Sequence, residues 1–200
     1  EVGAALCYDD EPFTFTSGRR SPVYIDCRTL ISYPRARAKL MDMAVETIQR
    51  EIGYESIDVV AGGETAGIAF AAWIAERLGL PMVYVRKAPK GFGRMAQIEG
   101  TFEPGSRVLL VEDLATDGGS KINFINALRA AGASVTDCFV LFHYGIYPAS
   151  ASSMKEQGVR LHELATWWDV ITEAEERNYF PADKASVVRT YLSDPENWTP

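Results

Sequence analysis

The sequence predicts an α/β fold in which helices flank a central, mostly parallel sheet, with a small N-terminal hood outside it. Two observations favour this class. From residue 34 onward, short apolar runs alternate with amphipathic stretches, and glycines separate one from the next. Such alternation is typical of parallel strands joined by right-handed crossovers. The length of 200 residues suits one domain, so we expect a hood over about 1–33 and a core over about 34–200.

The hood is predicted from the stretch 13–26, where apolar and polar residues alternate on both sides of Ser17 and Gly18. Alternation of this kind indicates strands, and a Ser-Gly pair favours a turn. We therefore expect a small hairpin outside the main sheet.

The core opens with an amphipathic helix. Pro34 suits a helix start, apolar residues recur every four positions up to Ile52, and Gly53 supplies a stop. The elements expected after it are a strand over 57–61, a helix over 65–78, strands over 82–85 and 108–111, a helix over 122–131, strands over 135–142 and 159–164, and helices over 167–177 and 181–192.

Composition excludes several classes of protein. The formal net charge of −7 argues against general nucleic-acid binding. No apolar run approaches the roughly 18 residues of a membrane span. Cys7, Cys27 and Cys138 are far apart, so they predict neither a disulfide framework nor a zinc site. We expect a reducing, cytoplasmic setting. The chain begins at Glu1 rather than at a methionine, which leaves a start upstream open.

The most informative stretch is 108–120, where four apolar residues run into Glu112 and Asp113 and then into a polar loop with two glycines. Ligands of α/β proteins bind at the carboxyl ends of parallel strands. The acidic pair, expected at this rim, could accept hydrogen bonds from a sugar diol, and the loop 116–120 could bind a phosphate with its N–H groups. The alternative is that the acids only cap a helix or face solvent.

A second strand, 57–61, also runs directly into a glycine-rich turn and a helix. Parallel pairing would place this turn beside the first, where it would suit a second phosphate group. The alternative is an ordinary connection in which Gly67 permits close helix packing.

The stretch 86–94 gathers four cations in an otherwise acidic chain, and Gly91 and Gly93 favour flexibility. A mobile cationic loop could close over a polyphosphate and neutralise charge on a leaving group. The alternative is a solvated surface loop. His143 and His162 are expected to be structural. The pair Trp167-Trp168 is expected in the core, and the alternative is a stacking platform.

Together these pieces resemble the type I phosphoribosyltransferases, whose PRPP motif of thirteen residues is similar to 108–120, and within them the members that use orotate. The resemblance extends to 13–22, 61–67, 86–90 and 98–100. It implies a type I phosphoribosyltransferase-like fold and transfer of the phosphoribosyl group from PRPP to orotate. The products are orotidine 5′-monophosphate and pyrophosphate, in pyrimidine biosynthesis.

The resemblance also implies the roles of individual residues. The residues implied to bind PRPP are Gly62, Gly63, Glu64, Arg86, Lys87, Lys90, Glu112, Asp113, Leu114, Ala115, Thr116, Asp117, Gly118, Gly119 and Ser120. The residues implied to be catalytic are Arg86, Lys87, Lys90 and Asp113. Those implied to bind orotate are Tyr24, Ile25 and Thr116.

A metal and a partner subunit are implied as well. Mg²⁺ would be bound mainly by substrate oxygens, with Glu112 and Asp113 contacting it through water and no direct protein ligand. A homodimer is implied, in which the flexible loop 87–101 reaches the neighbouring subunit's site.

Several positions depart from the family pattern. Phe92 stands where a loop histidine is common, which makes Lys90 the better proton donor. The arginine that meets orotate's carboxylate has no match in 143–146, so Arg20 or backbone N–H groups are the candidates. Thr16 replaces a hood lysine, and Asp117 is unexpected beside a phosphate. Because the departures concern the base pocket, two alternatives stay open: a phosphoribosyltransferase for another purine or pyrimidine base, and a non-catalytic PRPP-binding regulator.

Overall fold

The structure is a computed structural model that describes residues 2–8, 10–15, 18–89, 97–116 and 119–199. Its centre is a sheet of six strands in the order β10-β9-β8-β5-β6-β7, parallel except for the antiparallel edge pair β6 and β7. The strands are β5 (Val59–Gly63), β6 (Met82–Val85), β7 (Ile98–Glu99), β8 (Arg107–Ala115), β9 (Ser134–His143) and β10 (Arg160–Thr166). The predicted fold class is confirmed.

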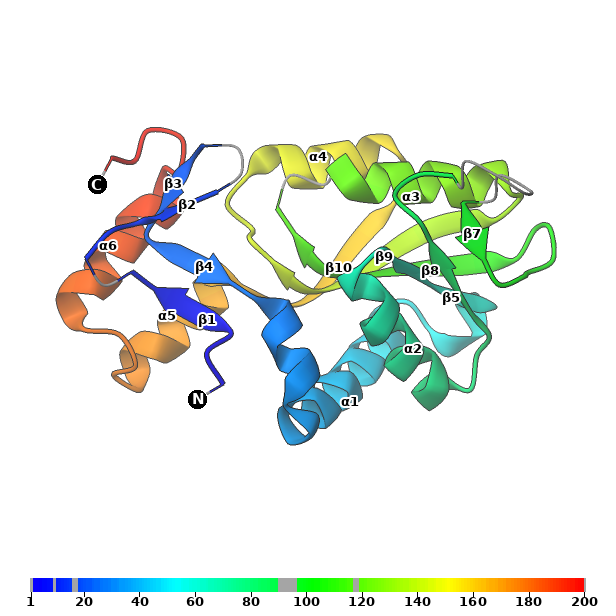
Figure 1. The fold of residues 1–200 in the computed structure, drawn as a ribbon, viewed down its shortest axis with the longest axis horizontal. Helices are drawn as coiled ribbons and strands as arrows, with labels where there is room; N and C mark the ends of the chain where they lie inside the picture. The colour runs from blue at the N-terminus through cyan, green and yellow to red at the C-terminus, as the bar shows by residue number, and fades with distance from the viewer. Residues whose placement is uncertain (1, 9, 16–17, 90–96, 117–118, 200) are drawn as a thin grey trace.

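Helices cover both faces of this sheet (Figure 1). One face packs against α1 (Pro34–Glu51) and α2 (Ala66–Leu78), and the other against α3 (Gly119–Ala130) and α4 (Pro148–Glu156). Side chains of β8 therefore alternate: Leu110 faces the α3 side and Leu109 the α1 side. No helix among the described residues is long and apolar enough to cross a membrane.

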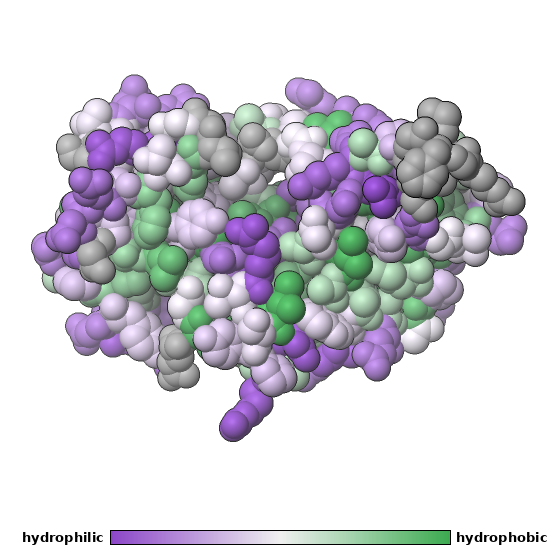
Figure 2. Space-filling view, in the orientation of Figure 1, coloured by the Kyte–Doolittle hydropathy of each residue, from purple (hydrophilic) through white to green (hydrophobic). Residues whose placement is uncertain are grey.

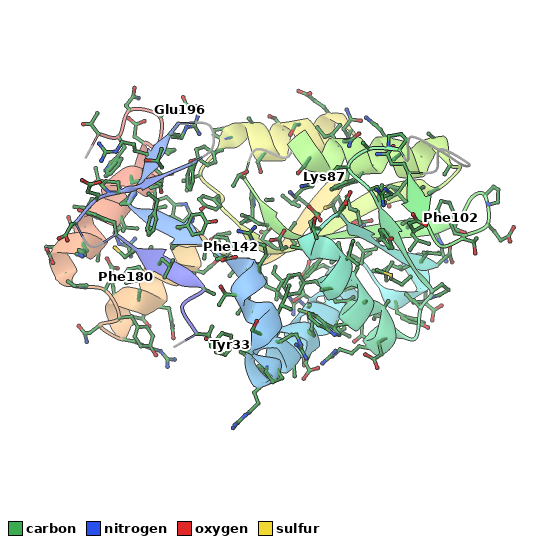
Figure 3. All side chains as sticks on the ribbon, viewed as in Figure 1. Tyr33, Lys87, Phe102, Phe142, Phe180 and Glu196 are labelled. Carbon is green, nitrogen blue, oxygen red and sulfur yellow. The ribbon has the colours of Figure 1, made fainter. Side chains whose placement is uncertain are left out.

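The hood lies at one end of the sheet with the last two helices, α5 (Trp167–Glu176) and α6 (Ala182–Ser193) (Figure 1). It consists of β1 (Ala5–Cys7), β2 (Phe13–Thr14), β3 (Arg20–Ser21), β4 (Val23–Ile25) and a 3-10 helix, η1 (Cys27–Ser32). Hood strand β4 joins Phe142 and Trp167 in one buried cluster, and Figure 3 shows Phe142 at this junction. The hood is thus fixed to the end of β9.

The small hairpin predicted outside the main sheet is confirmed as the antiparallel pair β2 and β3. Strand β2 pairs with β3, whereas β4 pairs with β1, which the sequence analysis did not predict. It also missed α4, whose Ala- and Ser-rich sequence has a weak apolar period, as well as the short strand β7 and the 3-10 helix η2 (Tyr54–Ser56). The helix expected over 122–131 begins earlier, at Gly119.

Helix boundaries follow local chemistry. Pro34 occupies the first turn of α1, and Gly79 ends α2 in the left-handed conformation at φ 65°. A capping box formed by Thr166 and Asp169 starts α5. These signals account for the close agreement between predicted and observed helices in the core.

Two predicted strand ends were wrong, and both errors affect the site. Gly62 and Gly63 belong to β5 rather than to a turn, because they pair with β6. Strand β8 continues past the acidic pair to Ala115, because its parallel ladder with β9 extends as far as His143. Glu112 therefore lies inside the sheet and not at its rim.

Candidate active site

Nine of the predicted site residues line one cavity of about 380 Å³ at the carboxyl ends of β5 and β8. Figure 2 shows the surface hollowed between the hood and the core helices. The residues that line the cavity are Tyr24, Ile25, Asp26, Cys27, Arg28, Glu64, Thr65, Ala66, Lys87, Glu112, Asp113, Leu114, Thr116, Ser120 and Lys121. The structure thus brings the hood, the acidic pair and the base of the cationic loop together. Parallel pairing of β5 with β8 places the turn after β5 beside the acidic segment, as the sequence predicted.

A larger and more apolar cavity, of about 820 Å³, lies between β1 and α5. Its lining includes Ala5, Val170 and Phe180. None of the predicted site residues contributes to it, so it is not the candidate active site.

Glu112 is the most buried member of the acidic pair, with 6% of the residue exposed. Its Oε1 atom has no hydrogen-bond partner among the described residues. Gly63 and Gly67 make room for this carboxylate, since a Cβ atom on either would overlap Oε1. Burial raises the pKa of Glu112 to about 7, against the opposing charge of Lys121, while neighbouring Asp113 raises it further.

Asp113 also lines the cavity and is partly exposed. Burial raises its pKa, and the positive charges of Lys121 and Arg28 act in the opposite direction. Two adjacent carboxylates in one cavity can accept hydrogen bonds from two hydroxyl groups. The arrangement therefore suits a vicinal diol.

Lys121 is a member of the site that the sequence analysis missed. It lies in the first turn of α3, is only 3% exposed, and lines the cavity beside the acidic pair. Its spacing from Phe124, Ile125 and Leu128 places it on the buried face of α3, and this helical spacing was the available signal. A buried lysine next to two carboxylates provides their nearest compensating charge.

The base of the cationic loop is fixed by hydrogen bonds. The backbone N–H of Lys87 donates to Oε2 of Glu64 at 2.7 Å, and Nδ2 of Asn123 donates to the Lys87 carbonyl at 2.9 Å. Gln97 and Arg86 are joined in both directions, at 2.8 and 2.9 Å. Figure 3 shows Lys87 between the hood and the sheet. Glu64 thus anchors the loop from within the cavity, a role that the sequence did not indicate.

The hood contributes Tyr24 and Ile25, the two residues predicted to cover the base. Asp26, Cys27 and Arg28, which the sequence analysis did not assign, line the same cavity. Nε of Arg28 donates to Asp26 at 3.1 Å, and its Nη2 donates to the Tyr24 hydroxyl at 3.4 Å. Arg20, proposed for carboxylate recognition, is exposed on β3 and does not line the cavity.

The phosphate loop is described in part. Leu114, Thr116 and Ser120 line the cavity, whereas Ala115 is fully buried in β8. Gly119 and Ser120 form the exposed start of α3. Thr116 is therefore placed between the acidic pair and the end of that helix.

Other predicted site residues do not reach the cavity. Gly62 and Gly63 are buried within β5, and Arg86 is absent from the lining, with its buried Nε unpaired among the described residues. The positions of Lys90, Phe92, Asp117, Gly118 and Thr16 lie outside the described residues.

The two histidines have structural partners, as predicted. Nε2 of His143 lies 2.5 Å from Oγ of the buried Ser150, and Nε2 of His162 lies 2.7 Å from Oδ1 of Asp137. Trp167 is fully buried, as expected for a core residue, but Trp168 is 37% exposed. The expectation of a core position was therefore wrong for Trp168.

The cavity offers oxygen donors for a hard cation in Glu112 and Asp113. Among the described residues there is no cluster of three or more histidine, cysteine, aspartate or glutamate side chains that could bind a metal ion. This donor set fits a magnesium ion that takes most of its ligands from a substrate and water.

Comparison with known proteins agrees with this geometry. The chain matches the family model of the phosphoribosyl transferase domain over residues 30–181. It is 56% identical over 198 residues to the orotate phosphoribosyltransferase of Dinoroseobacter shibae, covering 99% of this chain and 88% of that protein. The corresponding protein of Rhizobium meliloti is 54% identical over 199 residues, with 100% and 86% covered.

A solved structure is also similar. The crystal structure of orotate phosphoribosyltransferase from Aeropyrum pernix has a TM-score of 0.75 at 34% identity, covering 90% of this chain and 96% of that one. The family model and the relatives extend over the sheet, the acidic pair and the loop base described above. The chain therefore belongs to the phosphoribosyltransferase family, as a member of its orotate phosphoribosyltransferases.

Proposed function

We propose that the protein transfers the 5-phosphoribosyl group of PRPP to N1 of orotate, giving orotidine 5′-monophosphate and pyrophosphate in pyrimidine biosynthesis. One observation carries the proposal. The acidic pair, the start of α3 and the anchored base of the cationic loop face the same cavity. A diol, a phosphate and a pyrophosphate can thus be bound at once, which is the set of groups that PRPP presents.

The acidic pair binds the ribose. Glu112 and Asp113 accept hydrogen bonds from the two ribose hydroxyls and hold the sugar above the sheet. Positive charge develops on the ribose as its bond from C1 to pyrophosphate stretches. Asp113, the more exposed of the two carboxylates, stabilises that charge electrostatically.

The 5′-phosphate binds at the start of α3, where Thr116 and Ser120 line the cavity. The first N–H groups of a helix have no partners within the helix, and its dipole favours an anion there. The predicted loop members Asp117, Gly118 and Gly119 belong to the same subsite. Thr116 also faces the base, together with Tyr24 and Ile25 from the hood.

The leaving pyrophosphate is neutralised by cations. Lys87 lines the cavity at the base of the loop, where Glu64 and Asn123 anchor its backbone. Family resemblance supports the same role for Lys90 and for Arg86, whose side chain is not part of the described lining. Lys90 supplies the proton to pyrophosphate, because Phe92 occupies the position of the usual loop histidine. Glu112 and Asp113 would contact Mg²⁺ through water, while oxygens of PRPP would provide most of its ligands, and the ion would add further neutralising charge.

We infer in addition that the enzyme is a cytoplasmic homodimer in which loop 87–101 reaches the neighbouring active site. Family resemblance supports the dimer. None of the three cysteines forms a disulfide among the described residues, which is compatible with a reducing compartment.

A single assay tests the proposal. The protein is mixed with PRPP and Mg²⁺ and with orotate, uracil, adenine, hypoxanthine or guanine, and pyrophosphate release is followed. We expect release with orotate. If pyrophosphate is released only with a different base, that base and not orotate is the acceptor. If PRPP binds but no base gives pyrophosphate release, the protein is a PRPP-binding regulator. Reactions without PRPP control for contaminating pyrophosphate.

A further inference from the structure

Arg28 has a fixed side chain with one open edge. Its backbone N–H donates to Oδ1 of Asp26, and its Nε donates to the same oxygen, both at 3.1 Å. Asp26 is the N-cap residue of η1, so one carboxylate orders both the helix start and the arginine. Yet 63% of the Arg28 side chain is exposed. The outer guanidinium nitrogens therefore remain available on the side away from Asp26.

The open edge of Arg28 lies at the base end of the cavity. Nη2 is 3.4 Å from the hydroxyl of Tyr24, and both residues line the cavity together with Ile25. Burial raises the pKa of Asp113, and the charge of Arg28 is among the influences that oppose this rise, as expected if the two residues face the same space. Without the positive charge of Arg28, an anion bound beside Asp113 would be repelled by the Asp113 carboxylate.

The other cations of the cavity have different surroundings. Lys87 follows β6 at the pyrophosphate side, where Glu64 and Asn123 fix its backbone. Lys121 is buried beside the acidic pair. Of the positively charged residues that the structure describes in the cavity lining, Arg28 is thus the one that comes from the hood.

Orotate differs from uracil by a carboxylate on C6, next to the nitrogen that attacks the ribose. A base held for this attack brings its carboxylate close to the acidic pair, so recognition needs a compensating cation. The planar guanidinium group is suited to this task, because its nitrogens can donate two parallel hydrogen bonds to one carboxylate.

We propose that Arg28 determines acceptor specificity by binding the C6 carboxylate of orotate, with Asp26 as the residue that positions it. The proposal rests on the proposed transfer to orotate and deepens it. Some members of the family bind this carboxylate with an arginine that has no match in 143–146 of this chain. The proposal assigns the contact to Arg28 of the hood. Arg20, the earlier candidate, does not line the cavity.

Two nucleotides that differ only in this carboxylate provide the test. Binding of orotidine 5′-monophosphate and uridine 5′-monophosphate is measured by titration calorimetry for the unaltered protein and for Arg28→Met, Arg28→Lys and Arg20→Met. Arg20→Met is the matched control, because it removes an exposed hood arginine outside the cavity. PRPP affinity and thermal unfolding verify that each variant keeps its fold.

We expect Arg28→Met to weaken binding of orotidine 5′-monophosphate by about 10- to 100-fold, the effect of losing hydrogen bonds to a charged group. Binding of uridine 5′-monophosphate and PRPP should change little. The affinity of Arg28→Lys for orotidine 5′-monophosphate should lie between those of Arg28→Met and the unaltered protein. Arg20→Met should bind both nucleotides as the unaltered protein does. In the base assay, Arg28→Met should lose turnover with orotate in the same proportion.

Two results would overturn the assignment of Arg28 alone: an undiminished preference for the carboxylated nucleotide in Arg28→Met, or an equal loss of both nucleotides. If the unaltered protein does not prefer orotidine 5′-monophosphate and releases no pyrophosphate with orotate, the proposed function fails, and the role of Arg28 fails with it.

Discussion

Gly67 in α2 and Glu112 in β8 occupy adjoining space, so that a Cβ atom on Gly67 would overlap Oε1 of Glu112. The same Cβ would lie 2.6 Å from the carbonyl oxygen of Val111, a backbone atom that cannot rotate away. The missing side chain at Gly67 thus lets a buried carboxylate lie between a helix and the sheet. The alternative reading of Gly67 as a close-packing residue is confirmed, and this packing serves the site.

Gly67→Ala should therefore lower both stability and PRPP affinity. Overpacking typically costs about 1–3 kcal/mol, and displacement of the Glu112 carboxylate should disturb ribose binding. Urea unfolding and PRPP titration measure the two effects. Ala72→Gly, at an exposed position of the same helix, is the control: it should cost about 1 kcal/mol through helix propensity and leave PRPP affinity unchanged. Unchanged affinity in Gly67→Ala would contradict the link to Glu112.

The raised pKa of Glu112 predicts that the stability of the protein depends on pH. Burial raises this pKa from 4.5 to about 7, so the folded protein favours the protonated carboxyl group. The stability that native Glu112 contributes is complete below pH 4.5 and is lost as the pH rises to about 7. Glu112→Gln removes this titration.

The free energy of unfolding of the unaltered protein, minus that of Glu112→Gln, should thus fall by up to about 3 kcal/mol across this window. Urea unfolding at a series of pH values, without PRPP or Mg²⁺, measures the difference. A difference that is independent of pH, or that grows with pH, would contradict the raised pKa.

Lys121→Met keeps the length of a buried side chain while removing its charge. The acidic pair then lacks its nearest compensating charge, and a buried charge left without compensation costs roughly 3–5 kcal/mol. We expect lower stability at pH 8 and PRPP binding weaker by roughly tenfold, a loss of about 1.4 kcal/mol. Lys39→Met, at an exposed position of α1, should change neither property. Equal behaviour of the two variants would show that Lys121 does not support the acidic pair.

Lys90→Ala should slow turnover far more than it weakens orotate binding, because the proposed role of Lys90 is toward the leaving pyrophosphate. Loss of one donor to developing charge costs about 3 kcal/mol, or roughly 100-fold in kcat. Steady-state kinetics with PRPP and orotate varied in turn separate kcat from KM. Lys155→Ala, an exposed lysine on α4, is the control. An unchanged kcat would remove Lys90 from the mechanism.

The sequence by itself determined the α/β class, the core helices and the identity of the phosphoribosyl donor. These properties depend on local signals: the apolar period, glycine and proline at helix ends, and the PRPP motif at 108–120. They can be read without knowing which distant segments meet, because each is encoded within one continuous stretch.

Tertiary structure decided what surrounds the acidic pair. Pairing of β8 with β9 extended the strand past Glu112 and buried it, and α3 brought Lys121 to the same place. Packing of the hood against the end of β9 placed Arg28 in the lining of the same cavity as the acidic pair. These contacts join residues far apart in the chain, and the burial and charge that they produce arise only when the segments are packed together.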